Sequence, residues 1–163
     1  MKIFQIDADN DMEIVESVAK SAFSETPDAS LDNWISFSYM KKTIKEGRGY
    51  GLKAVDNNEQ VAGIIYAQQE NPINGKEGEE KWVIIIAAVA PQYSGKGIGS
   101  LLLFDLELLA RKHKVKKLFT FTNKGDEQVI NFYKKNGYID AGWIKDYQYG
   151  KDNSAVFLLK YLD

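Results

Sequence analysis

Three glycines at alternate positions, Gly95, Gly97 and Gly99, separate an apolar run from a Leu-rich segment in the stretch VAPQYSGKGIGSLLL (residues 89–103). Glycine is entropically costly in an ordered element, so this spacing indicates a special backbone shape or a close approach that side chains would block. A strand that ends in a glycine turn and leads into a helix directs several unpaired N–H groups at one spot, where the helix dipole adds positive charge. The stretch therefore predicts a site for a phosphate or pyrophosphate, with a turn that merely redirects the chain as the alternative.

Neighbouring side chains could strengthen this anion site, because Ser94 and Ser100 carry hydroxyl donors and Lys96 carries a positive charge. A P-loop does not fit, since Ala90 stands where its first glycine would be and Gly97 follows the lysine. A dinucleotide fingerprint starting at Gly95 does not fit either, because its third glycine would fall at position 100, where this chain has a serine. A nucleotide-binding α/β protein is kept as an alternative.

The composition excludes several other kinds of chemistry. The chain has 163 residues, a formal net charge of −2, no cysteine and one histidine, His113. Disulfides, thiolate metal sites and cysteine nucleophiles are therefore excluded, and neither a Ser-His-Asp triad nor nucleic-acid binding is expected. The acidic run from Asp7 to Asp11 does not continue as a calcium loop, because Met12 and Val18 replace the required Gly and Glu, so no metal is expected. Without a signal-peptide core or a long apolar run, a cytoplasmic protein with no membrane span is expected.

The elements that would position the glycine turn follow from hydrophobic periodicity. Leu31–Glu46 is predicted as one amphipathic helix, and residues 71–80 as a polar connecting loop. The helix over 97–113 has apolar residues on a second flank, at Phe104 and Leu108, so we expect burial on more than one side. One α/β domain over residues 1–163 is predicted, with a helix after the acidic run, a short helix over 126–135, and strands over 2–6, 50–55, 60–69, 81–90, 118–122, 138–144 and 155–161.

Two segments together resemble the GNAT superfamily of N-acetyltransferases. The glycine stretch is similar to its motif V-x-P-x-x-[Q/R]-G-x-G-x-G, with Val89, Pro91 and the three glycines in register. After one predicted strand, Phe132 to Tyr138 (FYKKNGY) matches its F-Y-x-x-x-G-[F/Y] segment. Ser94 departs from the usual Gln or Arg, which implies weaker cofactor affinity, and Asp126 stands where Asn is frequent.

The resemblance implies a fold and a cofactor. The fold would be a mixed, mostly antiparallel sheet of about seven strands, splayed between two central parallel strands (81–90 and 118–122) and flanked by about four helices. The cofactor would be acetyl-CoA or CoA, whose pantetheine arm would bond to the first of these strands like an extra strand. The implied cofactor-binding residues are Ala88, Val89, Ala90, Ser94, Gly95, Lys96, Gly97, Ile98, Gly99, Ser100, Asn123, Asp126 and Phe132.

The resemblance also implies direct transfer of an acetyl group to an amine. Tyr133 would be the general acid near the sulfur, although the same position suits a core aromatic side chain. The main-chain N–H near Val89 would stabilise the oxyanion. The general base is left open between a chain of water molecules and the carboxylates of Glu70, Glu79 and Glu80.

The acceptor amine would lie over the first two helices and the last two strands, where aromatic residues suit a cationic amine. A small-molecule amine and a peptide or protein N-terminus both stay open, and homodimers are common among relatives. The alternative function is an acetyl-CoA sensor without turnover. The expected acceptor-binding residues are Trp34, Phe37 and Tyr147, in an aromatic set that also includes Tyr39 and Tyr149.

Overall fold

The computed structural model describes residues 1–24, 31–70, 75–148 and 150–162. Short 3₁₀ helices span Leu31–Asn33 and Pro91–Tyr93. The strands are β1 (Lys2–Gln5), β2 (Gly49–Val55), β3 (Val61–Gln69), β4 (Lys81–Val89), β5 (Lys117–Asn123), β6 (Ile139–Ile144) and β7 (Ala155–Tyr161). The α-helices are α1 (Met12–Ala22), α2 (Phe37–Lys45), α3 (Gly75–Glu79), α4 (Ile98–Lys112) and α5 (Glu127–Lys135).

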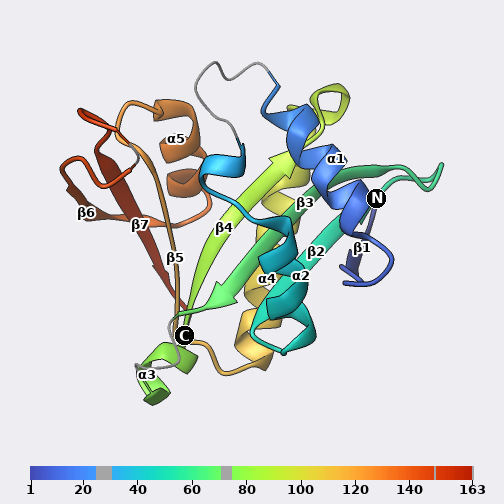
Figure 1. Cartoon of the computed structure of the whole chain (residues 1–163), viewed down its shortest axis with the longest axis horizontal. Coiled ribbons are helices and arrows are strands. Elements are labelled where there is room, and N and C mark those ends of the chain that lie inside the picture. Colours follow the sequence, from blue (N-terminus) through green and yellow to red (C-terminus); the bar gives the residue numbers. More distant parts are fainter. Residues whose placement is uncertain (25–30, 71–74, 149, 163) are drawn as a thin grey trace.

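The strands form one mixed sheet in the order β1-β2-β3-β4-β5-β7-β6 (Figure 1). Helices α1 and α2 lie in front of the β1–β4 half in this view, and α4 lies behind it. Strands β3 and β4 are covered on both faces, which is why their sequences are continuously apolar. On the α4 side the buried cluster extends to Tyr133 and Tyr138. The result is a single α/β domain whose two layers of core meet at β3 and β4.

The sheet is splayed at its centre, as expected. Strands β4 and β5 run parallel but pair only from Lys81↔Lys117 to Val83↔Phe119. Just beyond this point the register of β4 against β3 shifts between Tyr66 and Ala67. The shift leaves Ile85 as the extra residue of a β-bulge, which bends a strand. The gap between β4 and β5 therefore opens toward their carboxyl ends, next to the glycine turn.

The segment predicted as one helix over Leu31–Glu46 is instead two. A 3₁₀ turn ends at Asn33, and α2 begins only at Phe37. Ser36 has an extended backbone, and its hydroxyl accepts a hydrogen bond from Tyr39 N at 3.2 Å, so it caps α2. Local capping therefore outweighs the continuous helical pattern. The predicted loop over 71–80 was also wrong in part, because Gly75–Glu79 forms α3 and raises the helix count from about four to five.

The second apolar flank of α4 is not buried. Leu102, Leu103 and Leu106 are at most 1% exposed against β2, β3 and β4, whereas Phe104 and Leu108 are 55% and 41% exposed. The expectation of burial on several sides was therefore wrong. The helix lies across an outer face of the sheet, and nothing in the described residues covers its far side.

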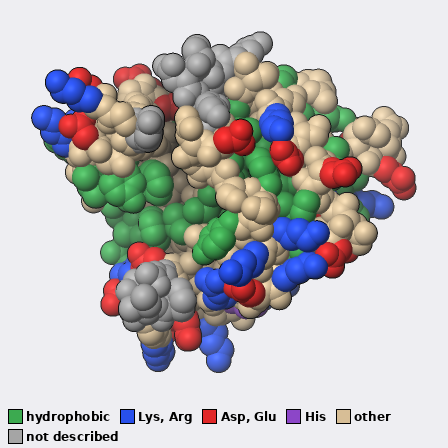
Figure 2. All heavy atoms as spheres, viewed as in Figure 1, with side chains coloured by type: hydrophobic (Ala, Val, Ile, Leu, Met, Phe, Trp, Pro, Cys, Tyr) green, Lys and Arg blue, Asp and Glu red, His purple; other side chains and the backbone are tan. Residues whose placement is uncertain are grey.

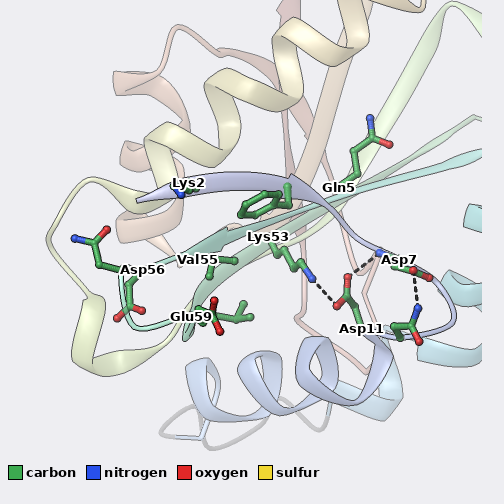
Figure 3. A pocket seen from close by; sticks show the side chains of 12 residues that line it. Lys2, Gln5, Asp7, Asp11, Lys53, Val55, Asp56 and Glu59 are labelled. Atoms are coloured by element: carbon green, nitrogen blue, oxygen red, sulfur yellow. Dashed lines mark hydrogen bonds and ion pairs between the residues drawn. The ribbon is translucent and has the colours of Figure 1, made fainter.

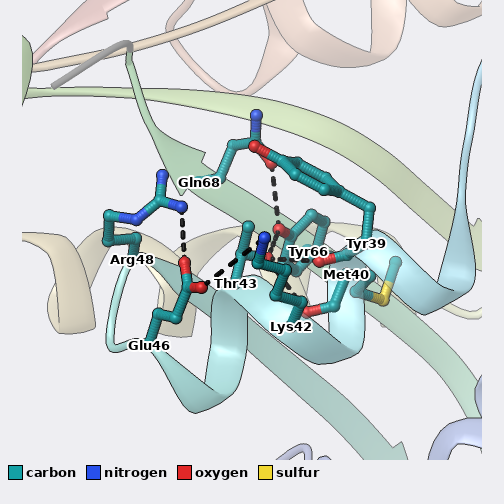
Figure 4. A network of polar contacts seen from close by, with 8 residues as sticks. All are labelled: Tyr39, Met40, Lys42, Thr43, Glu46, Arg48, Tyr66 and Gln68. Carbon is teal, nitrogen blue, oxygen red and sulfur yellow. Dashed lines mark hydrogen bonds and ion pairs between the residues drawn. The ribbon is translucent and has the colours of Figure 1, made fainter. Parts of the chain in front are cut away.

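Gly49, the first residue of β2, lies in close contact with Thr43 and Tyr66, two members of the polar network in Figure 4. The Thr43 hydroxyl lies 2.6 Å from the Tyr66 hydroxyl, which donates to Gln68 Oε1 at 3.0 Å. A Cβ on Gly49 would stand 2.7 Å from Thr43 Oγ1 and 2.9 Å from the Tyr66 hydroxyl.

Gly49→Ala is therefore expected to lower the free energy of unfolding by about 1–3 kcal/mol, because the methyl group must push apart a buried hydrogen-bonded pair. Urea denaturation measures this change. The control is Gly125→Ala, where the nearest atom is 3.3 Å away and a change within about 0.5 kcal/mol is expected. Equal stabilities for Gly49→Ala and wild type would refute the close contact.

Candidate active site

A cleft of ≈ 230 Å³ lies on the α4 side of the gap between β4 and β5. Strand β4 contributes two small side chains, the start of α4 contributes a glycine, and α5 contributes the remaining wall. Its lining residues are Ala87, Val89, Gly99, Gln128, Val129, Phe132 and Tyr133. The cleft is thus an apolar slot with one phenol at its wall and the glycine turn at its mouth.

Two different structural requirements explain the three glycines of the turn. Gly95 and Gly97 have φ values of +74° and +77°, a left-handed conformation that other residues adopt only with strain, and neither is crowded. Gly99 has ordinary helical geometry, but a Cβ there would lie 3.2 Å from the Phe132 ring. The first two shape the turn, and the third lets α5 pack against the first turn of α4.

The turn presents unpaired donors. The first helical bond of α4 runs from Leu101 N to Gly97 O at 3.0 Å, and the main-chain N–H groups of residues 95–100 have no partner in the described part of the chain. Tyr93 fixes the approach to the turn by donating to Asp56 Oδ2 at 2.6 Å. Several amides at a solvent-exposed helix N-terminus form a strong anion site. Lys96 does not extend it here, because its ammonium group donates to Gln92 O at 3.0 Å.

The main-chain groups of β4 divide between its two neighbours. Ala90 N donates to Ala62 O at 2.9 Å, and groups along a strand alternate in direction. The N–H and C=O groups of Ala88 and Ala90 therefore point toward β3, while those of Ala87 and Val89 point into the gap. This corrects the expectation for Ala88 and Ala90, whose main-chain groups are turned away from the gap. It also adds Ala87, whose main-chain groups point the same way as those of Val89.

Tyr133 places its phenol in the interior beside the cleft. The side chain is 4% exposed, and its ring packs edge-on against Phe132 (5.0 Å) and Tyr138 (5.2 Å). Burial raises the pKa of Tyr133 to about 12, although the hydroxyl of Thr120 acts in the opposite direction. The phenol is therefore protonated at ordinary pH and able to donate a proton.

The other predicted cofactor residues lie around the start of α5. Asp126 caps this helix, accepting from Val129 N at 3.1 Å. Asn123 ends β5, where its Oδ1 accepts from Gly125 N at 2.8 Å and its amide nitrogen bonds to Asn153. Both side chains shape the turn that brings Phe132 and Tyr133 to the cleft.

The expected acceptor residues fall into two groups. Trp34 is exposed and packs edge-on against Phe23 at 5.4 Å, and Phe37, the first residue of α2, is half-buried against the core on the α1 and α2 side. Tyr147 packs against Phe121 and Phe157, at 5.1 and 5.2 Å, on the other side of the gap. Figure 2 shows hydrophobic side chains gathered over β5 and β7. Tyr149 lies outside the described residues.

The carboxylates considered as bases lie at the closed end of the gap. Glu70 binds Lys81 Nζ at 2.6 Å, where β4 begins, and Glu79 and Glu80 directly precede the same strand. Strand β4 rises about 3.3 Å per residue, so Val89 is about 26 Å farther along it than Lys81. The separation disfavours all three as bases at the open end of the gap.

A larger hollow of ≈ 640 Å³ lies elsewhere, beside β1, β2 and the start of α1 (Figure 3). Lys53 and Asp11 pair within it, since Lys53 Nζ lies 2.5 Å from Asp11 Oδ1, and Asp11 Oδ2 accepts from Asp7 N at 2.7 Å. In the residues that the structure describes, no three metal-binding side chains gather to hold an ion. Within the same ranges, every helix is too short or too polar to cross a membrane.

The splayed sheet, the glycine turn at the start of α4 and the buried phenol of Tyr133 meet at one cleft. The chain belongs to the acetyltransferase (GNAT) family, whose family model matches residues 12–138. No curated protein sequence matches it.

Solved structures with the same fold are distant in sequence. A ribosomal-protein-alanine N-acetyltransferase from Brucella melitensis is 20% identical, covers 99% of this chain and 100% of its own, and has a TM-score of 0.81. An aminoglycoside 6'-N-acetyltransferase complexed with coenzyme A is 18% identical over 100% of this chain and 98% of its own, with a TM-score of 0.76. An N-acetyltransferase from Staphylococcus aureus is 17% identical over 99% and 98%, with a TM-score of 0.80. These likenesses support the fold.

The buried tyrosines make stability sensitive to alkali. The pKa values of Tyr66 and Tyr133 are each raised to about 12, mainly by burial. A tyrosine whose pKa is higher in the folded than in the unfolded protein stabilises the fold, and this stabilisation is complete below the unfolded pKa of about 10. It is lost as the pH rises from 10 toward the folded pKa of about 12. We expect the unfolding free energy to fall progressively between pH 10 and pH 12, by several kcal/mol in all, in urea titrations. Tyr66→Phe should reduce this slope, and an unchanged slope would contradict the assignment.

Proposed function

We propose that this protein transfers an acetyl group from acetyl-CoA to a primary amine of a small molecule or of a peptide or protein N-terminus. The observation that carries the proposal is the row of main-chain amides from Gly95 to Ser100, which have no partner among the described residues and lie at the mouth of a cleft containing Tyr133. A diphosphate and a thioester on one extended ligand would fit these two features together.

The residues present suit acetyl-CoA. The free amides at the start of α4, with the hydroxyls of Ser94 and Ser100, would hold the diphosphate. The gap-facing groups of Ala87 and Val89 would pair with the pantetheine amides, because an unpaired strand edge needs such partners. Phe132 would pack beside the arm, with Asn123 and Asp126 shaping the turn that leads into its helix, α5.

Acetyl-CoA supplies an acetyl group activated as a thioester: the neutral amine attacks its carbonyl carbon, the carbon–sulfur bond breaks, and CoA leaves. The Val89 N–H would stabilise negative charge on the carbonyl oxygen. Tyr133 would give its phenolic proton to the departing sulfur. The amine proton would leave through water, because Glu70, Glu79 and Glu80 lie at the other end of β4.

The acceptor would approach from the face that carries α1 and α2. Tyr147 with Phe121 and Phe157 would form one wall, and Trp34 and Phe37 would form the other. The similar structures include enzymes named for ribosomal-protein alanine and for aminoglycosides, so both classes of acceptor are proposed. We further propose a cytoplasmic enzyme, and a homodimer that sedimentation would detect.

Calorimetry with CoA and acetyl-CoA tests the binding step. Gly97→Val is expected to weaken CoA binding by about tenfold or more, because its side chain and the strain at φ +77° disturb the amide row. The matched control is Gly47→Val, which imposes the same strain at φ +70° near the end of α2 and should leave CoA binding unchanged. No heat with either ligand would overturn the proposal.

Release of free thiol, followed with a panel of amines and N-terminal peptides, tests turnover. Transfer to any of them supports the enzyme, and binding of CoA without thiol release would instead identify an acetyl-CoA sensor. A thermal-shift comparison of CoA with NAD and ATP separates a general nucleotide-binding protein, because only a ligand of the native state raises the melting temperature.

A further inference from the structure

The turn between β2 and β3 contacts the segment that leads into the glycine turn. Asp56 makes this contact with one carboxylate that serves two turns. Its Oδ1 accepts from Asn58 N at 2.8 Å and from Gln60 N at 2.9 Å, which holds its own turn. Its Oδ2 accepts from the hydroxyl of Tyr93, 37 residues further along the chain, at 2.6 Å. Asp56 lines the larger hollow of Figure 3 and does not line the cleft.

Tyr93 in turn holds the near end of the amide row, the free N–H groups of residues 95–100. Its own N–H donates to Ala90 O at 2.8 Å, and its ring packs against the buried cluster on the α4 side. Ser94 N donates to Pro91 O at 3.1 Å, and beyond it no main-chain N–H of the row has a partner in the described part of the chain. The far end of the row belongs to α4, so the position of the near end depends on how Tyr93 is held.

The bond between Tyr93 and Asp56 joins a neutral donor to an ionised acceptor. The Tyr93 hydroxyl is the main cause that holds the pKa of Asp56 below its usual value, so the carboxylate is charged at neutral pH. A hydrogen bond to a charged group is stronger than one between neutral groups. A negative charge near an anion site would by itself weaken anion binding. The bond to Tyr93 and the bare charge therefore predict opposite effects on CoA affinity when Asp56 is removed.

We propose that Asp56 is a positioning residue for the diphosphate of CoA, which fixes Tyr93 and thereby the near end of the amide row from a turn outside the cleft. This inference rests on the proposed function. Without the bond, CoA itself would have to order the near end of the row, and that ordering would reduce its affinity. Acetyl transfer takes place at the other end of the cofactor, beside Tyr133, and would proceed at its usual rate once acetyl-CoA is bound.

The first experiment is Tyr93→Phe, which removes one hydroxyl and leaves the turn between β2 and β3 intact. Calorimetry should show a Kd for CoA about tenfold higher than that of wild type. With saturating acetyl-CoA, kcat should stay within about twofold on the same reasoning. The matched control is Tyr50→Phe, which loses a hydroxyl that donates to Gly47 O at 2.8 Å and should leave the Kd unchanged. An unchanged Kd in Tyr93→Phe would overturn the inference.

A double-mutant cycle tests whether Asp56 acts through Tyr93. Asp56→Ala should also weaken CoA binding, and Tyr93→Phe should add little further loss in that background. Additive losses would mean that the two residues act independently, which contradicts the inference. Tighter CoA binding in Asp56→Ala would also overturn it, because Asp56 would then act as a repelling charge.

A readout without ligand keeps this test separate from the proposed function. In ¹⁵N-labelled protein free of CoA, the amide resonances of Gly95 and Gly97 should shift in Tyr93→Phe and stay in place in Tyr50→Phe. Both variants keep an aromatic ring, so a shift reports a changed turn. Unmoved resonances would refute the inference whether or not CoA binds. Shifted resonances in a protein whose wild type binds no CoA would instead overturn the proposed function, and with it the role in binding CoA.

Discussion

Replacing Tyr133 by Phe is expected to lower the kcat of acetyl transfer by about 10²- to 10⁴-fold, the range for loss of a general acid, with CoA affinity within about twofold of wild type. The phenol is 4% exposed at the wall of the cleft, and its pKa of about 12 keeps it protonated. Stopped-flow release of thiol with saturating amine measures the change. A kcat equal to that of wild type, under conditions where chemistry limits turnover, would remove Tyr133 from the mechanism.

The chain offers a matched control for this variant in Tyr138, whose ring lies 5.2 Å from that of Tyr133. Its hydroxyl is also buried, but it has no hydrogen-bond partner among the described residues. Removing an unsatisfied buried hydroxyl relieves a desolvation cost, so Tyr138→Phe should keep full activity and equal or higher stability. A large loss of kcat in Tyr138→Phe would mean that removing either buried hydroxyl lowers activity, so that the effect of Tyr133→Phe would not be specific to a general acid.

The second large effect concerns a buried ion pair that holds α5 in place. Lys160 Nζ, on β7, lies 2.8 Å from both carboxylate oxygens of Glu107 on α4 and donates to Asn136 O at the end of α5. The Glu107 side chain is 6% exposed. Replacing Lys160 by Met leaves this carboxylate buried, and Arg111, at 3.9 Å, is then the one cation beside it among the described residues. The expected loss of stability is about 3 kcal/mol or more, or about 6–12 °C in Tm.

Two variants make this test specific. Lys20→Met breaks the exposed pair with Glu16 on α1, which should cost less than about 1 kcal/mol. Adding Glu107→Leu to Lys160→Met removes the stranded charge and should recover most of the lost stability. If Lys160→Met were as stable as Lys20→Met, the pair would contribute nothing to the docking of α5.

The glycine turn shows how much of the site can be predicted from sequence. The spacing of Gly95 and Gly97 predicted a special backbone, and both have positive φ. Spacing could not show that Gly99 serves a different purpose, because its neighbour Phe132 is 33 residues away in the chain. Turn chemistry is local and readable, whereas close approaches between distant segments are set by tertiary packing.

Tertiary effects also explain what the sequence did not predict. Ser36 breaks a continuous helical pattern by capping α2, and Phe104 is exposed because α4 has the sheet on one side only. The β-bulge at Ile85 decides which main-chain groups face the gap, and no side-chain pattern marks it. Thr120 lies in an alternating strand like any other, so its contact with Ile84 could be found only from the fold.

The separation of β4 from β5 gives the middle of the sheet the behaviour of an outer edge. Ala87 and Val89 direct their amide hydrogens into open space, although β3 and β5 lie on either side of them. In deuterium-exchange measurements on the ligand-free protein, these two central amides should take up label faster than Ala88 beside them. An occupant of the gap would reverse that order, so exchange at two residues reports how completely the sheet has been bridged.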